Sequence, residues 1–272
     1  MICFPNAKIN IGLNIVSKRK DGYHNLETVF YPVPLKDILE FTVPENKIAK
    51  TNMLLSGTLL DIPDEQNICM KAYCLLSADY QLPNIQIHLH KMIPSGAGLG
   101  GGSSDAAFLL NELNQYFKLN ISHEKLLAYA LELGADCAFF LKNKAVFANG
   151  VGNKFETIGL DLKGYYILIV KPEFSINTAY AFKNIVPCAP EITLKELIKQ
   201  PVALWKDKII NDFELPLFEK YPELNKIKTA LYKMGAKYAS LSGSGSALFG
   251  LFKEKPKAER LFEGMFVFGA NL

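Results

Sequence analysis

The chain has 272 residues, with 30 Lys and Arg against 27 Asp and Glu and a formal net charge of +3. Its 49% hydrophobic and 21% charged content predicts a globular protein with one large or two modest domains. The mild basicity suits anionic ligands and argues against a nucleic-acid-binding surface. Five scattered cysteines without a Cys-x-x-Cys pair, a start unlike a signal peptide and only short apolar runs predict a cytoplasmic protein that contacts no membrane.

Residues 7–16 alternate apolar and polar side chains, which predicts a β-strand. Lys8 and Asn10 lie next to each other on its polar face. Such residues are often only solvated, and the pattern alone does not decide between solvation and function.

Residues 17–24 form a basic turn that contains Arg19, Lys20, Tyr23 and His24. A plain hairpin loop accounts for its Asp-Gly pair. The cations and rings also suit phosphates and a nucleobase, so both interpretations stay open. Strand is predicted for residues 25–43, with interruptions at Pro32 and Pro34.

A glycine-rich stretch at residues 94–107 follows a helix predicted at 66–80 and a strand predicted at 85–92. Five of its residues are glycines within seven positions, and a helical pattern begins at Ala106. Backbone N–H groups at a helix N-terminus bind anions, so this stretch predicts a phosphate site.

Other glycine loops fit this stretch less well. A Walker A loop needs a lysine after the glycines, and none is present. A dinucleotide-binding loop needs a strand after the helix, whereas residues 122–133 predict a second helix. The motifs that accompany a protein-kinase glycine loop are missing. A flexible linker is the remaining alternative.

The rest of the chain predicts a second domain. Asp136 follows a helix-ending glycine and is expected to be the N-cap of a short helix. Residues 157–164 have two glycines and weak periodicity, so we predict domains at 1–156 and 157–272. Further elements are predicted as a strand at 144–148, a strand at 165–171, a helix after 178, a helix at 222–234, a strand-turn-strand at 238–252 and a helix at 255–265 followed by a short strand. The Gly/Ser turn at 242–246 is either a plain hairpin or a wall of the phosphate site.

Three segments, residues 5–10, 94–107 and 240–247, resemble the three signatures of the GHMP kinases in their usual order. The resemblance implies an α+β fold, with an N-terminal domain like domain 2 of ribosomal protein S5 and a ferredoxin-like C-terminal domain. It implies ATP as phosphate donor. The residues that match the ATP phosphate loop are Pro94, Ser95, Gly96, Ala97, Gly98, Leu99, Gly100, Gly101, Gly102, Ser103 and Ser104.

Within that family, residues 18–27, 134–136 and 149–152 resemble the member that acts on a cytidine diphosphate-linked methylerythritol in the non-mevalonate isoprenoid pathway. The resemblance implies transfer of the γ-phosphate of ATP to the 2-hydroxyl of that substrate. Lys8 and Asp136 match the catalytic pair, and Asp136 either accepts the proton or only orients the hydroxyl.

The same resemblance implies the remaining contacts. Asn10 matches a substrate contact, Tyr23 and His24 match the cytidine site, and Phe174 matches a second aromatic wall. The segment around Asn67 and Ile68 is expected near adenine. We expect Mg²⁺ to be held mainly by phosphate oxygens, with a hydroxyl from Ser103 or Ser104 and no predicted protein carboxylate ligand.

One departure from the family is Ala138, which stands where a proline is usual and is expected to loosen the turn after Asp136. Kinases of mevalonate, homoserine or sugars are alternatives within the family, and the basic loop at 19–24 argues against them. An RNA-binding module without catalysis is the alternative outside it. The sequence makes no prediction of oligomeric state.

Overall fold

A computed structural model describes residues 1–45, 50–58, 63–183, 185–257 and 261–272. The chain forms two units, each built from segments that are separate in sequence. Unit 1 comprises Met1–Ala7, Leu35–Ser95 and Gly100–Asn143, and unit 2 comprises Lys8–Pro34, Gly96–Leu99 and Lys144–Leu272.

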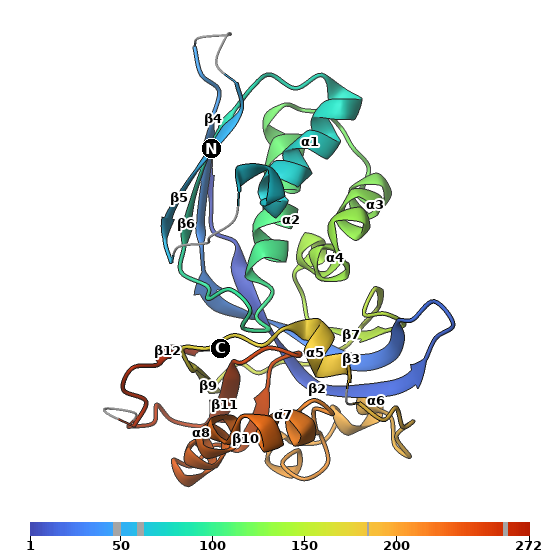
Figure 1. The fold of residues 1–272 in the computed structure, drawn as a ribbon, viewed down its shortest axis with the longest axis vertical. Coiled ribbons are helices and arrows are strands. Elements are labelled where there is room, and N and C mark those ends of the chain that lie inside the picture. The colour runs from blue at the N-terminus through green and yellow to red at the C-terminus, as the bar shows by residue number, and fades with distance from the viewer. Residues whose placement is uncertain (46–49, 59–62, 184, 258–260) are drawn as a thin grey trace. The chain divides into compact units, whose positions relative to one another are not determined.

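Unit 1 is a four-stranded sheet with helices packed on one face (Figure 1). The strand order is β1-β4-β6-β5, and only the β5–β6 pair is parallel. Its elements are β1 (Ile2–Cys3), β4 (Ile38–Thr42), β5 (Asn52–Gly57), η1 (Asp64–Gln66), α1 (Ile68–Tyr80), β6 (Gln86–Lys91), α2 (Gly101–Tyr116), α3 (His123–Leu133) and α4 (Ala135–Lys142). Alternate residues such as Leu39, Ile87 and Leu89 are buried, because one face of the sheet meets the helices.

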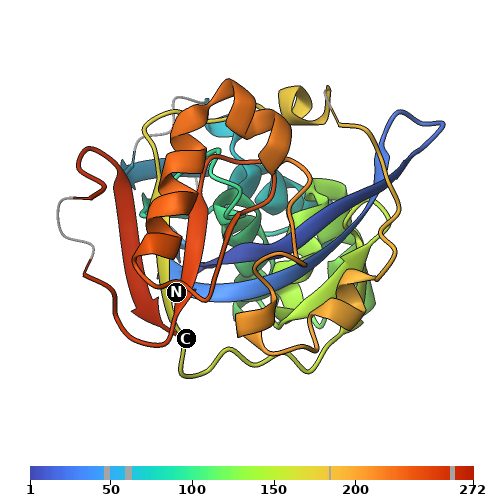
Figure 2. The same ribbon diagram turned by 90° about the horizontal axis from the view of Figure 1, so that it is seen from below.

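Unit 2 contains two four-stranded sheets, ordered β2-β3-β7-β8 and β10-β11-β9-β12. Their strands are β2 (Asn6–Lys18), β3 (His24–Lys36), β7 (Val146–Asn149), β8 (Lys154–Thr157), β9 (Tyr166–Lys171), β10 (Tyr238–Leu241), β11 (Leu248–Phe252) and β12 (Phe266–Asn271). The helices are α5 (Thr178–Lys183), α6 (Leu194–Leu197), η2 (Val202–Leu204), α7 (Glu214–Lys220) and α8 (Pro222–Lys233). Figure 2 shows α8 lying across the second sheet, on which it buries Leu224, Ile227 and Leu231 at helical spacing.

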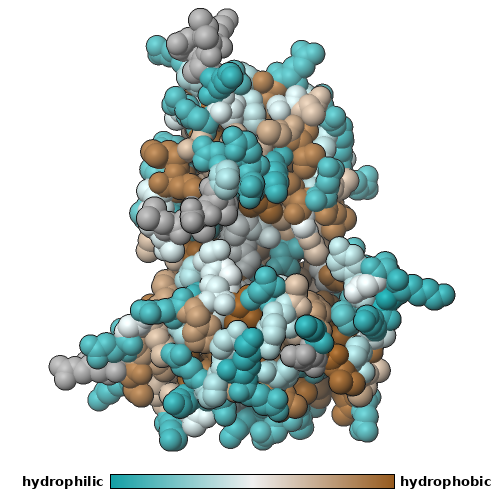
Figure 3. Space-filling model, viewed as in Figure 1, coloured by the Kyte–Doolittle hydropathy of each residue, from teal (hydrophilic) through white to brown (hydrophobic). Residues whose placement is uncertain are grey.

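The surface drawn in Figure 3 carries hydrophilic side chains interspersed with hydrophobic ones in both units. None of the helices in the described part of the chain is both long enough and apolar enough to cross a membrane.

Three predicted elements differ from the structure. β3 continues through Pro32 and Pro34 as one strand, because both prolines lie beyond the residues that pair with β7, Thr28–Phe30, where a missing N–H donor would break the ladder. α2 begins at Gly101 and not at Ala106. The predicted helix at 255–265 is wrong in its described residues, which are irregular or in turns, and its residues 258–260 lie outside the described chain.

A buried ionic cluster explains the break between β3 and β4. The Asp37 carboxylate turns inward, where it accepts hydrogen bonds from the Lys91 ammonium and from the N–H groups of Met92 (2.6 Å) and Ile93 (2.8 Å). Lys91 also donates to Asp105 Oδ2 at 2.7 Å. All three charged side chains are almost fully buried, beneath the segment that leads from β6 into the glycine loop.

In this cluster a single ammonium group, that of Lys91, donates to two carboxyl groups. Burial raises the pKa of the Asp105 carboxyl well above its usual range, and the neighbouring Asp37 raises it further while Lys91 opposes the shift. Asp105 Oδ1 has no hydrogen-bond partner in the described part of the chain. Removing the ammonium therefore leaves two buried carboxylates uncompensated.

We predict that two substitutions in this cluster lower the free energy of unfolding by very different amounts. Lys91→Met should lower the free energy of unfolding by about 3–5 kcal/mol, since it breaks a buried ion cluster. Asp105→Asn should cost far less, because an amide can accept from Lys91 and donate to Asp37 without carrying a charge. Urea unfolding of both variants at pH 7 measures the difference.

The pH dependence gives a second measurement. A carboxyl with a raised pKa stabilises the fold most below its unfolded pKa of about 3.9 and loses that contribution as pH rises. Asn does not titrate, so the stability of Asp105→Asn relative to wild type should improve between pH 4 and pH 7. A relative stability that falls over this interval contradicts the assignment.

Candidate active site

Lys8 is held in a fixed position on β2. Its side chain is only 3% exposed, and its ammonium donates to Asn10 Oδ1 at 2.5 Å and lies 4.9 Å from the centre of the Phe30 ring. Asn10 Nδ2 donates to Thr28 Oγ1 (2.9 Å), which in turn donates to the carbonyl of Gly12 (2.6 Å). This chain of hydrogen bonds fixes the Asn10 amide with its oxygen toward Lys8. Thr28 was not identified from the sequence.

The first half of the glycine loop, Gly96–Leu99, is held by the third signature. The Ser242 hydroxyl donates to the Gly98 carbonyl at 2.9 Å and accepts the N–H of Asn10 at 3.2 Å. The Ala247 N–H donates to the carbonyl of Ala97 (3.1 Å), and the N–H of Lys8 donates to that of Leu99 (2.9 Å). Residues 242–247 thus pack directly against the loop and are more than a hairpin turn.

Gly98 is required at its position for two reasons. Its φ of +78° lies in the left-handed region, and an added Cβ would overlap the carbonyl oxygen of Ser242. In the described part of the chain, the N–H groups of residues 96–99 donate to no other backbone group. Such unused donors in a positive-φ turn are suited to binding an anion.

The second half of the loop becomes the start of α2. Gly100 is the N-cap, with φ of +70°, and Gly101 packs against Ile93 so closely that a Cβ would lie 2.9 Å from its side chain. The first N–H groups of an α-helix have no intrahelical acceptor, and together with the helix dipole they attract anions. The helix begins inside the glycine run, despite poor helix propensity, because only glycine allows this close packing.

Asp136 lies in the first turn of α4, two residues beyond the N-cap position that the sequence predicts for it. Gly134 is the N-cap, and α4 continues without interruption through Ala138, so the expected N-cap role of Asp136 and the looser turn are both wrong. The next residue, Cys137, is buried, and its thiol is hydrogen-bonded to Ser103. Burial raises the pKa of that thiol to about 11. This contact brings Ser103 of the loop to the residue after Asp136.

Asn67 and Ile68 also lie at the start of a helix. Asn67 is the N-cap of α1, where its side chain accepts the N–H of Cys69 at 2.9 Å. Ile68 faces Gly102, since a Cβ on that glycine would lie 3.5 Å from the Ile68 side chain. The structure therefore brings this segment to the glycine loop.

The aromatic residues predicted for the cytidine site differ in exposure and in ring contacts. The Tyr23 side chain is 67% exposed, and its N–H donates to Asp21, whose carboxylate also binds Arg19. The ring of His24 stacks on Phe182, with centroids 5.1 Å apart and an interplanar angle of 22°. Phe182 was not identified from the sequence.

The ring of Phe174 stacks on Tyr221, with centroids 5.0 Å apart. Among the described ring contacts, the structure therefore brings His24 to Phe182 and not to Phe174.

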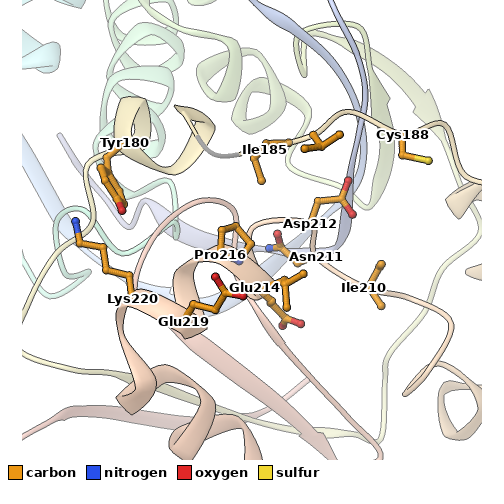
Figure 4. Close-up of a pocket in the computed structure, with 12 residues that line it drawn as sticks. Tyr180, Ile185, Cys188, Ile210, Asn211, Asp212, Glu214, Pro216, Glu219 and Lys220 are labelled. Carbon is orange, nitrogen blue, oxygen red and sulfur yellow. The ribbon is translucent and has the colours of Figure 1, made fainter.

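A cavity of about 790 Å³ lies near the 210–220 segment of unit 2 (Figure 4). Three carboxylates and one ammonium line it, from Asp212, Glu214, Glu219 and Lys220. The sequence predicted none of its lining residues as part of the site. Its charge is mainly acidic, which does not suit an anionic ligand.

Comparison with known proteins identifies the family. Residues 67–144 match the model of the GHMP kinases N terminal domain, and residues 193–268 match that of the GHMP kinases C terminal domain. A Bacteroides fragilis protein described as 4-diphosphocytidyl-2-C-methyl-D-erythritol kinase is 52% identical over 273 residues, which covers 100% of both chains. The chain belongs to this family of GHMP kinases.

Solved structures of GHMP kinases share the fold. A 4-(cytidine 5'-diphospho)-2C-methyl-D-erythritol kinase superposes with a TM-score of 0.82 at 30% identity and covers 100% of this chain and 99% of its own. The mevalonate kinase of Methanococcus jannaschii superposes with a TM-score of 0.71 at 15% identity, covering 100% of this chain and 98% of its own, which shows the fold alone. The α+β two-domain GHMP kinase fold implied by the sequence is therefore confirmed.

We predict that Gly98→Ala weakens ATP binding by this GHMP kinase at least about 10-fold, because the new Cβ must displace the loop from Ser242. Gly164→Ala is the matched control, since Gly164 has a similar φ of +82° and open space around it. Both variants carry the backbone strain of about 1–2 kcal/mol, but only the first moves the loop. Calorimetric titration with ATP measures the effect, and equal ATP affinities in the two variants contradict it.

Proposed function

We propose that the chain transfers the γ-phosphate of ATP to the 2-hydroxyl of 4-diphosphocytidyl-2-C-methyl-D-erythritol, giving the 2-phosphate and ADP in the non-mevalonate isoprenoid pathway. The full-length identity of 52% to the Bacteroides fragilis enzyme of that name carries the proposal. Relatives at 49% and 48% identity, from Parabacteroides distasonis and Porphyromonas gingivalis, have the same description.

Residues 94–104 hold the triphosphate of ATP in this proposal. Phosphoryl transfer depends mainly on positioning and on stabilising charge, and unused N–H donors at a helix start supply both. The unused donors of residues 96–99 and the glycine N-cap of α2 support this assignment. Asn67 and Ile68 lie near adenine in this proposal, which the position of Ile68 next to Gly102 supports.

Mg²⁺ accompanies ATP in the proposal, and it neutralises phosphate charge when bound. Such an ion would need few protein ligands, because phosphate oxygens and water would supply the rest. Ser103 is the fitting protein ligand, because its hydroxyl is partly exposed at the start of α2. The hydroxyl of Ser104 is buried and has no hydrogen-bond partner in the described part of the chain.

Lys8 and Asp136 carry the chemistry in the proposal. Lys8 stabilises the transferred phosphoryl group, and the network through Asn10 and Thr28 holds its ammonium in position. Asp136 receives or orients the proton of the acceptor hydroxyl. Asn10 sets the position of Lys8 and contacts the acceptor.

The cytidine end of the acceptor binds at the loop containing Tyr23 and His24. The exposed Tyr23 ring is available to stack on a pyrimidine, and stacking contributes about 1–3 kcal/mol per base. We propose Phe182 as the second ring, because it stacks on His24. Phe174 is the alternative from the sequence.

The wider setting is also proposed. The protein acts in the cytoplasm on a small molecule and binds neither nucleic acid nor membrane. The two family models match on either side of residues 157–164, which supports a division into domains 1–156 and 157–272.

A coupled ADP-release assay tests the function. Purified enzyme with ATP and Mg²⁺ should turn over 4-diphosphocytidyl-2-C-methyl-D-erythritol and leave mevalonate, homoserine and galactose unphosphorylated. Phosphorus NMR of the product should show a new phosphomonoester on the 2-hydroxyl. Turnover of another acceptor in preference to the cytidine-linked one contradicts the proposal.

We predict that Asp136→Asn lowers kcat by about 10²–10⁴-fold and leaves the ATP affinity within about twofold of wild type, because proton transfer contributes a factor of that size. Glu124→Gln is the control, since Glu124 is an exposed carboxylate in the first turn of α3. Steady-state kinetics of both variants, with calorimetric titration by ATP, measure the effect. Near-normal kcat in Asp136→Asn removes the carboxylate from the chemistry.

A pair of ring substitutions decides between Phe182 and Phe174. Phe182→Leu keeps apolar volume but removes the ring, so the KM for the cytidine-linked acceptor should rise about 5- to 10-fold, as for the loss of one stack. Phe174→Leu should leave that KM within about twofold. Tyr23→Ala, measured beside them, should raise it about 10- to 100-fold. The opposite order of the two phenylalanine variants restores the prediction from the sequence.

A further inference from the structure

Asn211 belongs to none of the three signatures, yet its side chain is only 2% exposed. It lies in the short segment between η2 and α7, at the wall of the cavity in Figure 4, beside Asp212. A buried amide needs partners for its oxygen and its nitrogen, and the partners of Asn211 connect it to the glycine loop.

The amide is fully engaged and held in one orientation. Its Nδ2 donates to the carbonyl of Leu241 at 2.9 Å and to that of Gly243 at 2.8 Å. Its Oδ1 accepts the N–H of Phe213 at 3.0 Å. Two carbonyls on one side and an N–H on the other leave only one way to place the amide.

The backbone that carries Asn211 is fixed to β2. Leu13 pairs with Asn211 in a parallel bridge, in which the Leu13 N–H donates to the Ile210 carbonyl and the Asp212 N–H donates to the Leu13 carbonyl, both at 2.9 Å. Asp212 Oδ2 also accepts the N–H of Ile15 at 2.6 Å. The backbone of Asn211 is therefore hydrogen-bonded to β2, the strand that carries Lys8 and Asn10.

The two carbonyls that Asn211 holds lie on either side of Ser242. That serine donates to the Gly98 carbonyl at 2.9 Å and accepts the N–H of Asn10 at 3.2 Å. The approach of Gly98 to the Ser242 backbone leaves no room for a side chain. A shift of the 241–243 turn must therefore move Gly98 as well.

We propose that Asn211 is a positioning residue for the phosphate loop, which sets the place of Gly98 by holding the backbone on both sides of Ser242. The proposal rests on the proposed assignment of residues 94–104 to the ATP phosphates. Asn211 touches no phosphate in this role and acts through Ser242. Its effect belongs to the nucleotide and not to the acceptor.

The chemistry requires an amide at this position. Asp has the same shape and keeps the acceptor for the Phe213 N–H, but it cannot donate to the two carbonyls when ionised. Each lost neutral hydrogen bond corresponds to about a fivefold change in an equilibrium constant. Two lost bonds that act on the loop should therefore weaken nucleotide binding about 10- to 30-fold.

The first experiment is calorimetric titration of wild type and Asn211→Asp with ADP and Mg²⁺, which needs no acceptor. We expect the dissociation constant for ADP to rise about 10- to 30-fold. In acceptor kinetics at saturating ATP, the KM for the cytidine-linked alcohol should stay within about twofold. An unchanged ADP affinity overturns the proposal, and so does an equal loss for both substrates.

Asn114→Asp is a matched control for stability. The amide of Asn114 also clamps loop backbone, since its Oδ1 accepts the N–H of Ile121 (3.0 Å) and its Nδ2 donates to the Ile121 carbonyl (3.3 Å). That loop lies after α2, away from its glycine-rich start. The control should lose thermal stability and keep its ADP affinity, and a comparable loss of ADP affinity there overturns the proposal.

Ser242→Ala tests the route and remains informative if Asn211→Asp does not fold. By itself, Ser242→Ala should weaken ADP binding several-fold, because it removes the hydrogen bond from Ser242 to the Gly98 carbonyl. Combined with Asn211→Asp it should add little, because both substitutions release the same loop. Additive losses in the double variant, or an unchanged affinity in Ser242→Ala, overturn the proposal.

These outcomes separate the proposal from the proposed function. If wild type binds ADP but does not phosphorylate the cytidine-linked alcohol, the choice of acceptor fails while the ADP titrations still decide the role of Asn211. If wild type binds no ADP, the loop assignment fails and the proposal fails with it.

Discussion

The hydroxyl of Ser242 occupies a point at which three distant segments meet. It accepts from the backbone of Asn10 and donates to the backbone of Gly98, 144 residues away in sequence. A hydroxyl is suited to this point because it donates and accepts at once. The polar face of β2, the first half of the glycine loop and the third signature are therefore held in register by one side chain. Gly245 in the turn at 242–247 approaches the backbone of Ala97 and Gly98 too closely for a Cβ.

Close packing also fixes the second half of the loop, at the start of α2. α2 starts among glycines, which are poor helix formers, because its first turn lies directly on Ile93 and over the Lys91 ammonium. Lys91 is itself fixed by Asp37 and Asp105. Each half of a stretch that by composition alone resembles a flexible linker is thus held by contacts within its own unit. If this loop binds phosphate as proposed, its fixed backbone reduces the conformational entropy lost on binding.

The sequence predicted most of the features that depend on residues close together in the chain. The alternation at 7–16 indicated the shared face of Lys8 and Asn10, and the glycines followed by a helix indicated an anion site, which stays a prediction. What the sequence did not reveal depends on contacts between distant residues. No local pattern marks Asp37, Lys91 and Asp105, which become a cluster only because the fold buries them together. Likewise, no local pattern marks Asn211, whose amide binds the carbonyls of residues 241 and 243. Phe174 and Phe182 are only eight positions apart, and nothing in their spacing tells which of them faces His24.

The start of α2 was misjudged for a related physical reason. Helix propensity places the boundary after the glycines, and tertiary packing places it among them, at Gly101. Interruptions of the strand are predicted at Pro32 and Pro34, whereas β3 continues through both and ends just before Asp37, whose carboxylate turns inward to Lys91. In both cases a strong local preference was outweighed by a long-range contact.

The way the chain passes between its units has a consequence for its synthesis. β2 and β3 leave the ribosome early, but β3 pairs with β7 beyond residue 145, and β2 is bridged by the segment at 210–212. Unit 1 has all of its segments once residue 143 has emerged, whereas unit 2 must wait for its final strand, β12. Such late, distant pairing slows folding and leaves strand edges exposed in the interim. The strand that carries Lys8 is thus among the first parts to be made and among the last to be secured.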